Sequence, residues 1–142
     1  MIQQYVDTGL VRFVHRDLPI IEIHPGAVLA AHVANCAAEQ GAFFPMQQRI
    51  FASGSAGAWV GGGDADYAVH LSEARQLGLD EAALQACVAS DRHAETIAAD
   101  VQLALDAGVR STPSFLVNGR LVIGAQPLEF WQSLFEQLLA EE

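Results

Sequence analysis

The sequence predicts an α/β fold in which helices separate the parts of a small sheet. Residues 10–18 are rich in β-branched and aromatic side chains, which favours a strand near the N-terminus. A long alanine-rich region follows, and its apolar residues recur at helical spacing. Near the C-terminus, two short apolar runs flank Asn118-Gly119, a pair typical of a type I′ hairpin turn. A strand separated from a hairpin by helices indicates one mixed sheet.

Composition limits the class of protein. The 142 residues are 51% hydrophobic and 17% charged, which indicates one globular domain with a real core. Seventeen acidic residues against seven basic ones give a formal charge of −10, which argues against binding to nucleic-acid phosphates. No apolar run reaches the length of a membrane span. The first ten residues lack the basic and apolar regions of a signal peptide, and no cofactor motif is evident.

The N-terminal residues predict the last turns of a helix, which ends at Gly9. In the strand predicted over 10–18, His15 falls on the apolar face, so we expect a hydrogen-bonded core histidine. Pro19 and Pro25 then bracket an extended loop.

Helical patterns fill the middle and the end of the chain. They lie within residues 26–41, 43–53, 65–78, 81–90, 90–108 and from Pro127 onward. Asp64 and Asp80 are predicted N-caps. The apolar face expected for the last helix consists of Leu128, Trp131, Leu134, Phe135 and Leu138. Residues 61–64, Gly-Gly-Gly-Asp, lack the Lys and Ser/Thr of a phosphate loop, and the chain's carboxylates are expected to be solvated.

The step Thr112-Pro113 precedes the first hairpin strand. A proline there is usually the ordinary start of a strand, and only about 5–6% of X-Pro bonds in folded proteins are cis. The residues around this proline, however, indicate a functional role for it. The stretch "GVRSTPSFLVNGRLVIGAQP", residues 108–127, resembles the C-terminal signature of the DsbA-like thiol–disulfide oxidoreductases, which have a thioredoxin fold.

Other segments resemble the same family in the same order. Residues 5–20 resemble the end of its active-site helix and its second strand, residues 24–51 the start of its helical insertion, and residues 106–110 the close of that insertion. The resemblance implies one partial domain over 1–142, with a helical insertion over 26–107 and a hairpin plus helix over 109–142.

The resemblance also implies a substrate site. In the family the proline is cis and faces a Cys-x-x-Cys pair, so Thr112 and Pro113 would bind substrate. Ser111 stands where the family usually has glycine, and Ser114 stands where the family often has threonine. The implied partners are protein or peptide thiols and disulfides, and the implied location is periplasmic or otherwise extracytoplasmic.

The family's first strand and its Cys-x-x-Cys are not present in this sequence. Either Met1 is an internal methionine of a longer protein, or the protein has lost its thiol chemistry. In both cases this chain alone should lack redox activity, because a disulfide is attacked by a thiolate. Two alternatives remain open: a non-catalytic peptide-binding module, and a relative of the glutathione-linked isomerases, which share the fold.

The family's first strand would lie between residues 10–18 and the hairpin strand at 114–118. Without it, both neighbours carry unpaired backbone groups and expose apolar side chains. The affected side chains are Val11, Phe13, Phe115 and Val117. We expect an open gap, a partner or a second copy that fills it, or a shift of 10–18 onto the hairpin.

Cys36 and Cys87 are the only cysteines of the chain, and both fall in the middle of predicted helices. Free buried thiols are one interpretation. A structural disulfide is another, because several DsbA-like proteins carry such a pair in the insertion; it requires a Cα–Cα distance below about 7 Å. Catalysis is disfavoured, because a mid-helix thiol lacks the free N–H groups that stabilise a thiolate. His32 shares a helix face with Cys36, which we attribute to packing and not to a metal site.

The remaining histidines, His24, His70 and His93, are scattered along the sequence and predict no ligand set.

Overall fold

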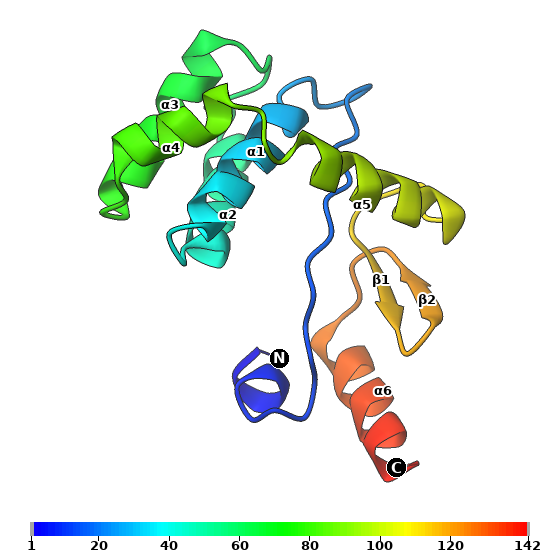
Figure 1. Ribbon diagram of the computed structural model, residues 1–142. Coiled ribbons are helices and arrows are strands. Elements are labelled where there is room, and N and C mark those ends of the chain that lie inside the picture. The colour runs from blue at the N-terminus through cyan, green and yellow to red at the C-terminus, as the bar shows by residue number, and fades with distance from the viewer. Residues whose placement is uncertain (1, 142) are drawn as a thin grey trace. The chain divides into compact units, whose positions relative to one another are not determined.

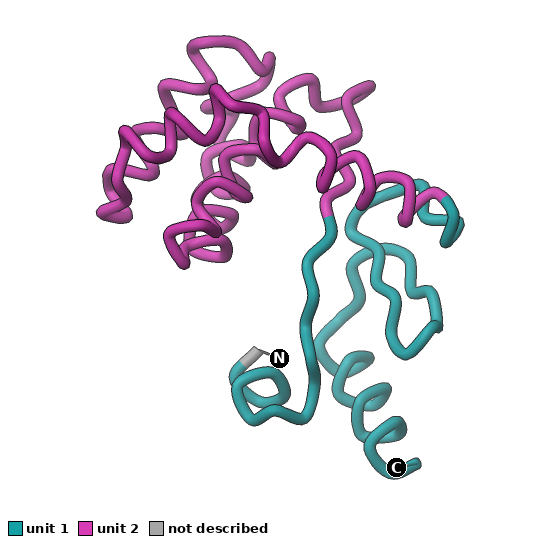
Figure 2. The backbone as a smooth tube through the Cα atoms, viewed as in Figure 1, with its two compact units in different colours: residues 1–16, 106–142 teal, residues 17–105 magenta. Residues whose placement is uncertain are grey.

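The computed structural model describes residues 2–141. Its chain divides into two compact units, residues 1–16 with 106–142 and residues 17–105 (Figure 2). The second unit is helical, whereas the first combines the hairpin with the two ends of the chain (Figure 1).

The helices occur where the sequence predicts them. They are the π-helix η1 (Ile2–Val6), α1 (Ala27–Ala38), α2 (Phe43–Ser55), α3 (Asp64–Gln76), α4 (Glu81–Ala89), α5 (Ala94–Asp106) and α6 (Leu128–Ala140). Gly9 ends the first of these segments with a φ of 78°, and its N–H donates to the Val6 carbonyl oxygen at 3.0 Å.

The two N-cap predictions have different outcomes. Asp80 caps α4 as predicted, because its carboxylate accepts the Ala83 N–H at 2.9 Å. The prediction for Asp64 was wrong: Asp64 is the first residue inside α3, and Gly63 occupies the cap position without a side-chain hydrogen bond.

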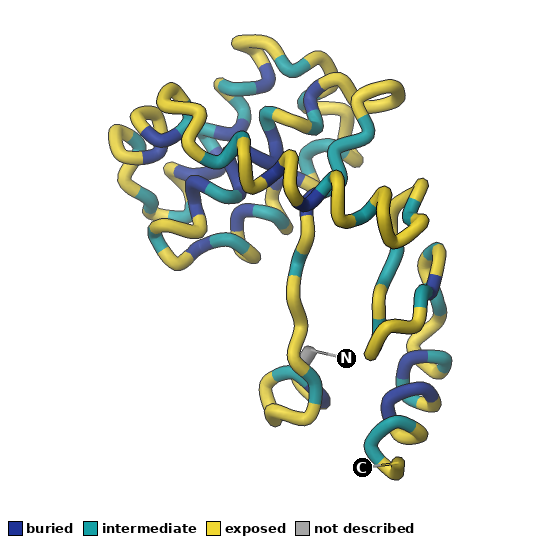
Figure 3. The backbone as a smooth tube through the Cα atoms, turned by 45° about the vertical axis from the view of Figure 1, so that its right-hand side comes forward, coloured by how far each residue is buried: buried dark blue, intermediate teal, exposed yellow. Residues whose placement is uncertain are grey.

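Residues 17–105 form their core around α1, which packs against α2, α3 and α4. Val33, Met46 and Leu84 are completely buried there. Figure 3 shows the buried stretches of the backbone in dark blue. The alanines of α1 allow this close approach, because their small side chains let neighbouring helices pack near its backbone.

A loop before α3 is folded around Asp66. The Asp66 carboxylate accepts the backbone N–H groups of Val60 at 3.0 Å and Gly61 at 2.7 Å, together with that of Gly62. The expectation that the carboxylates are solvated was therefore wrong for Asp66, and it was also wrong for Asp17, Glu73 and Asp100, which are buried as well. The Gly62 bond, supported by the other two, lowers the pKa of Asp66 although burial acts in the opposite direction.

The hairpin consists of β1 (Ser114–Val117) and β2 (Arg120–Ile123), paired antiparallel. Asn118 and Gly119 have φ values of 47° and 84°, as the predicted type I′ turn requires. On one face of the hairpin, Phe115 packs against Trp131 of α6 with ring centroids 4.6 Å apart. Val122, Leu134 and Phe135 of the same unit complete this small core with Tyr5 of η1.

The strand predicted over residues 10–18 was wrong. Residues 12–20 have no regular secondary structure, and among the described residues the sheet contains only β1 and β2. A strand needs a neighbouring strand for its ladder hydrogen bonds, and within residues 2–141 no strand pairs with this segment. The Val11 N–H instead bonds to the Tyr5 carbonyl oxygen at 2.8 Å.

Of the three outcomes expected for the missing strand, the described structure agrees best with the first, because the free edge of β1 stays open. The expected exposure is only partial. Val11, Phe115 and Val117 are half-buried against the α6 core, whereas Phe13 is 38% exposed. His15, expected in a core, is also half-buried.

Candidate functional site

The step Thr112-Pro113 stands at the head of β1. Its peptide bond is cis, and both residues are exposed. The Gly124 N–H donates to the Pro113 carbonyl oxygen at 2.9 Å, which extends the hairpin ladder by one pair beyond Ser114 and Ile123. The Ser114 hydroxyl donates to the Ser111 carbonyl oxygen at 2.7 Å and holds the turn before the proline.

The register decides which backbone groups of β1 remain open. In an antiparallel pair, successive residues direct their N–H and C=O groups alternately toward the partner strand and away from it. Because the Pro113 carbonyl oxygen accepts the N–H of Gly124, the residue just after β2, the outward groups of β1 belong to Ser114 and Leu116. Among residues 2–141 no strand pairs with this edge.

An apolar side chain lies at the same edge. Leu116 of β1 is 61% exposed. An exposed strand edge with apolar neighbours is suited to receive an extended segment, whose backbone supplies the missing ladder bonds. Thiol–disulfide exchange would in addition need a reactive thiolate beside such an edge.

The cysteines do not supply that group. Cys36 of α1 and Cys87 of α4 form a disulfide with a Cα–Cα distance of 5.8 Å. Each cysteine is only 1% exposed. In this state neither residue presents a thiolate, and both belong to the helical unit, residues 17–105.

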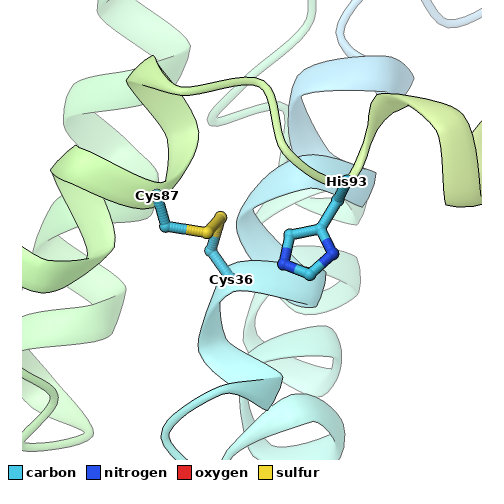
Figure 4. A group of neighbouring side chains, drawn as sticks. All are labelled: Cys36, Cys87 and His93. Carbon is cyan, nitrogen blue, oxygen red and sulfur yellow. A yellow bond between two sulfur atoms is a disulfide. The ribbon is translucent and has the colours of Figure 1, made fainter.

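The histidines near the disulfide differ from the sequence expectation. His32 Nε2 contacts Asp91 Oδ1 at 3.1 Å, so this histidine has a carboxylate partner of its own. His93 is not isolated: its imidazole lies beside the disulfide, and its nearest ligand atom and both sulfurs are within 4.8 Å of one another (Figure 4). In the sequence, the only indication that His93 lies near the disulfide is its position six residues after Cys87, just beyond the end of α4. Such a spacing is a weak indication.

Two further histidines, His70 and His24, do not belong to this cluster. His70 is completely buried, with its Nδ1 at 3.1 Å from Glu73 Oε2, whereas His24 is exposed.

Within residues 2–141, no helix is long and apolar enough to span a membrane.

Comparison with known proteins places these features in a family. A family model described as Thioredoxin matches residues 1–137. The chain is also 38% identical over 124 residues to Na(+)/H(+) antiporter NhaA 3 of Salinispora tropica, covering 87% of this chain and 18% of that protein. Na(+)/H(+) antiporter NhaA 1 of Salinispora arenicola is 36% identical over 119 residues, with coverages of 84% and 17%.

The chain therefore spans less than a fifth of the length of these curated relatives. The match to the family model, in contrast, extends over nearly the whole chain and includes the hairpin, the proline step and most of α6. The chain belongs to the thioredoxin family and has an α/β, thioredoxin-like fold.

Proposed function

We propose that this chain is the peptide-binding part of a DsbA-like thiol–disulfide oxidoreductase. The observation that carries the proposal is the open edge of β1 directly after Thr112 and Pro113. A substrate in extended conformation would pair with the outward backbone groups of Ser114 and Leu116, next to the proline. The substrate class is a protein or peptide that contains a thiol or a disulfide.

The chemistry of the proposed reaction needs a thiolate beside Pro113. A thiolate attacks one sulfur of a disulfide, a mixed disulfide forms, and the other sulfur leaves as a thiolate. Both cysteines of this chain are held in a buried disulfide. The proposal therefore assigns the nucleophile to a Cys-x-x-Cys outside this sequence and assigns substrate positioning to this chain.

A pair of proline variants tests the binding step. Proline lacks an N–H and is tolerated at a strand position whose N–H faces away from the ladder. By the hairpin register, both Leu116 and Ile123 have outward N–H groups, on opposite edges of the hairpin. Leu116→Pro should abolish binding of an extended cysteine-containing peptide, and Ile123→Pro should leave it unchanged.

Binding would be measured by titration calorimetry with a peptide whose cysteine is alkylated, so that no covalent step contributes. Equal loss in both variants would contradict pairing at β1. Displacement of the peptide by glutathione would favour the glutathione-linked relatives instead. In an insulin-reduction assay the chain alone should show no turnover, and turnover would overturn the assignment of the nucleophile to another segment.

A second candidate function has its own observation. The curated relatives are named as Na(+)/H(+) antiporters and are more than five times as long as the matched segment. The same β1 edge would then serve as a non-catalytic binding module of a longer transporter. The nucleotide sequence upstream of Met1 separates the two: an in-frame Cys-x-x-Cys supports the oxidoreductase, and membrane spans without that motif support the module.

A further inference from the structure

A cluster of metal-ligating side chains surrounds the disulfide in the helical unit. Cys36 comes from α1, Cys87 from α4, and His93 from the turn before α5 (Figure 4). One ligand atom from each of these residues lies within 4.8 Å of the other two. Two cysteines and a histidine are a donor set that zinc takes up readily, as thiolate sulfur and neutral imidazole nitrogen.

Glu39 contacts two members of this cluster. Its Oε1 lies 2.9 Å from His93 Nε2 and 3.5 Å from Cys87 Sγ. A disulfide sulfur carries no hydrogen, so the contact with Cys87 is not a hydrogen bond in the oxidised state. The other carboxylate oxygen, Oε2, accepts from Arg92 at 2.9 Å, which fixes the orientation of Glu39.

We propose that the reduced chain binds a zinc ion through Cys36, Cys87 and His93, with Glu39 in the fourth position. Tetrahedral zinc–sulfur bonds of about 2.3 Å place two sulfurs about 3.8 Å apart. Such a separation fits the 5.8 Å between the two Cα atoms, because rotation about the Cα–Cβ bonds moves the sulfurs apart. Disulfide and metal exclude each other, which makes this a redox-dependent site.

The conversion balances with a dithiol as the reductant. The reducing dithiol gives up two electrons and two protons and becomes a disulfide, while Cys36 and Cys87 become two thiols. Zinc then binds the two thiolates and releases the two protons. A disulfide of the same class as the one just formed can reverse the sequence: the ion leaves, the two thiolates pass two electrons to that disulfide, which takes up two protons and becomes a dithiol, and the bond between Cys36 and Cys87 forms again.

The donors of the proposed site differ in burial. The cysteines are 1% exposed, whereas the side chains of His93 and Glu39 are 21% and 39% exposed. The sulfurs thus form the closed side of the site, and the nitrogen and oxygen donors form its solvent side.

Cobalt titration tests the site, because Co²⁺ reports tetrahedral thiolate ligation by its colour. The chain, reduced with a phosphine and desalted without oxygen, should bind one Co²⁺ with a sulfur-to-metal charge-transfer band and should exchange it for Zn²⁺. The oxidised chain should show no such band. His93→Gln should weaken binding more than about tenfold, because loss of even an outer ligand partner costs 10–100-fold. His24→Gln, an exposed histidine away from the cluster, is the matched control.

Two further measurements keep the result decisive. Far-UV circular dichroism of each variant in its oxidised form establishes that it folds. Alkylation of Cys36 and Cys87 in the reduced chain should slow when Zn²⁺ is present, and His93→Gln should lessen this protection. The proposal is overturned by a reduced chain that binds no Co²⁺, by a reduced chain that stays unfolded in Zn²⁺, or by equal affinity in the two histidine variants.

Discussion

Asp66 Oδ2 accepts the backbone N–H of Gly61 at 2.7 Å, across five residues of a glycine-rich loop. The same oxygen also accepts from Val60 and Gly62, so one carboxylate satisfies three consecutive N–H groups. Three successive N–H groups that converge on one point form an anion-binding concavity. Here the anion is part of the chain, and it closes the loop onto the start of α3.

The first prediction concerns the acid sensitivity of this loop. The Gly62 N–H, supported by the other two, lowers the pKa of Asp66 below its ordinary value of 3.8. A lowered pKa in the folded state stabilises the fold at pH values above 3.8, and this stabilisation is lost as the pH falls through the lowered pKa. Asp66→Asn should therefore lower the thermal midpoint at pH 7, and its difference from the parent chain should narrow as the pH falls below 3.8.

Thermal unfolding followed by circular dichroism between pH 2 and pH 7 measures this difference. Asp64→Asn is the control, because Asp64 lies in the same helix turn but is exposed. A constant difference between Asp66→Asn and the parent at all pH values would show that the carboxylate charge is not what holds the loop.

The second prediction concerns the hairpin turn. Gly119 has a φ of 84°, and a Cβ placed there would meet no atom within 4 Å. Gly119→Ala should therefore cost about 1 kcal/mol through backbone strain alone. Gly61 also has open space but an ordinary φ, so Gly61→Ala should be neutral or slightly stabilising. In urea unfolding, the midpoints of the two variants should shift in opposite directions or by clearly different amounts. Equal shifts of the midpoint would refute the strain argument.

The third prediction concerns the disulfide. Cys36 and Cys87 are 51 residues apart, and closing a loop of that length stabilises a protein by about 4 kcal/mol in the chain-entropy description. The double variant Cys36→Ala, Cys87→Ala should lose stability of that order in urea unfolding. Reduction of the parent chain in the presence of a chelator should produce a similar loss. If both treatments left the midpoint unchanged, the disulfide would have no structural role.

Local signals were sufficient for most of the fold. The Asn118-Gly119 turn and the Asp80 cap each depend on groups within a few residues, and sequence captures such contacts directly. The strand expected over 10–18 failed for a non-local reason. Its composition favours a strand, but a strand forms only beside a partner, and the described chain offers it none.

In the candidate site, too, local features could be predicted from the sequence and non-local ones could not. The proline step could be recognised from a contiguous stretch, residues 108–127. The approach of His93 to the cysteines could not, because it depends on how α1, α4 and the following turn pack together. Asp66 was missed because its partners are backbone N–H groups, which leave no mark in the side-chain pattern.

The fourth prediction concerns the small core beside the hairpin. Phe135 is buried, and its ring centroid lies 5.1 Å from that of Tyr5 and 6.0 Å from that of Trp131. Phe135→Ala should cost about 3–5 kcal/mol, because it removes a large buried side chain from a core of few residues. In a Trp59→Phe background Trp131 is the only tryptophan, so its emission should shift to the red as water reaches it. Leu128→Ala, on the same helix but 46% exposed, should leave emission and stability almost unchanged, and an equal effect of the two alanines would contradict this core.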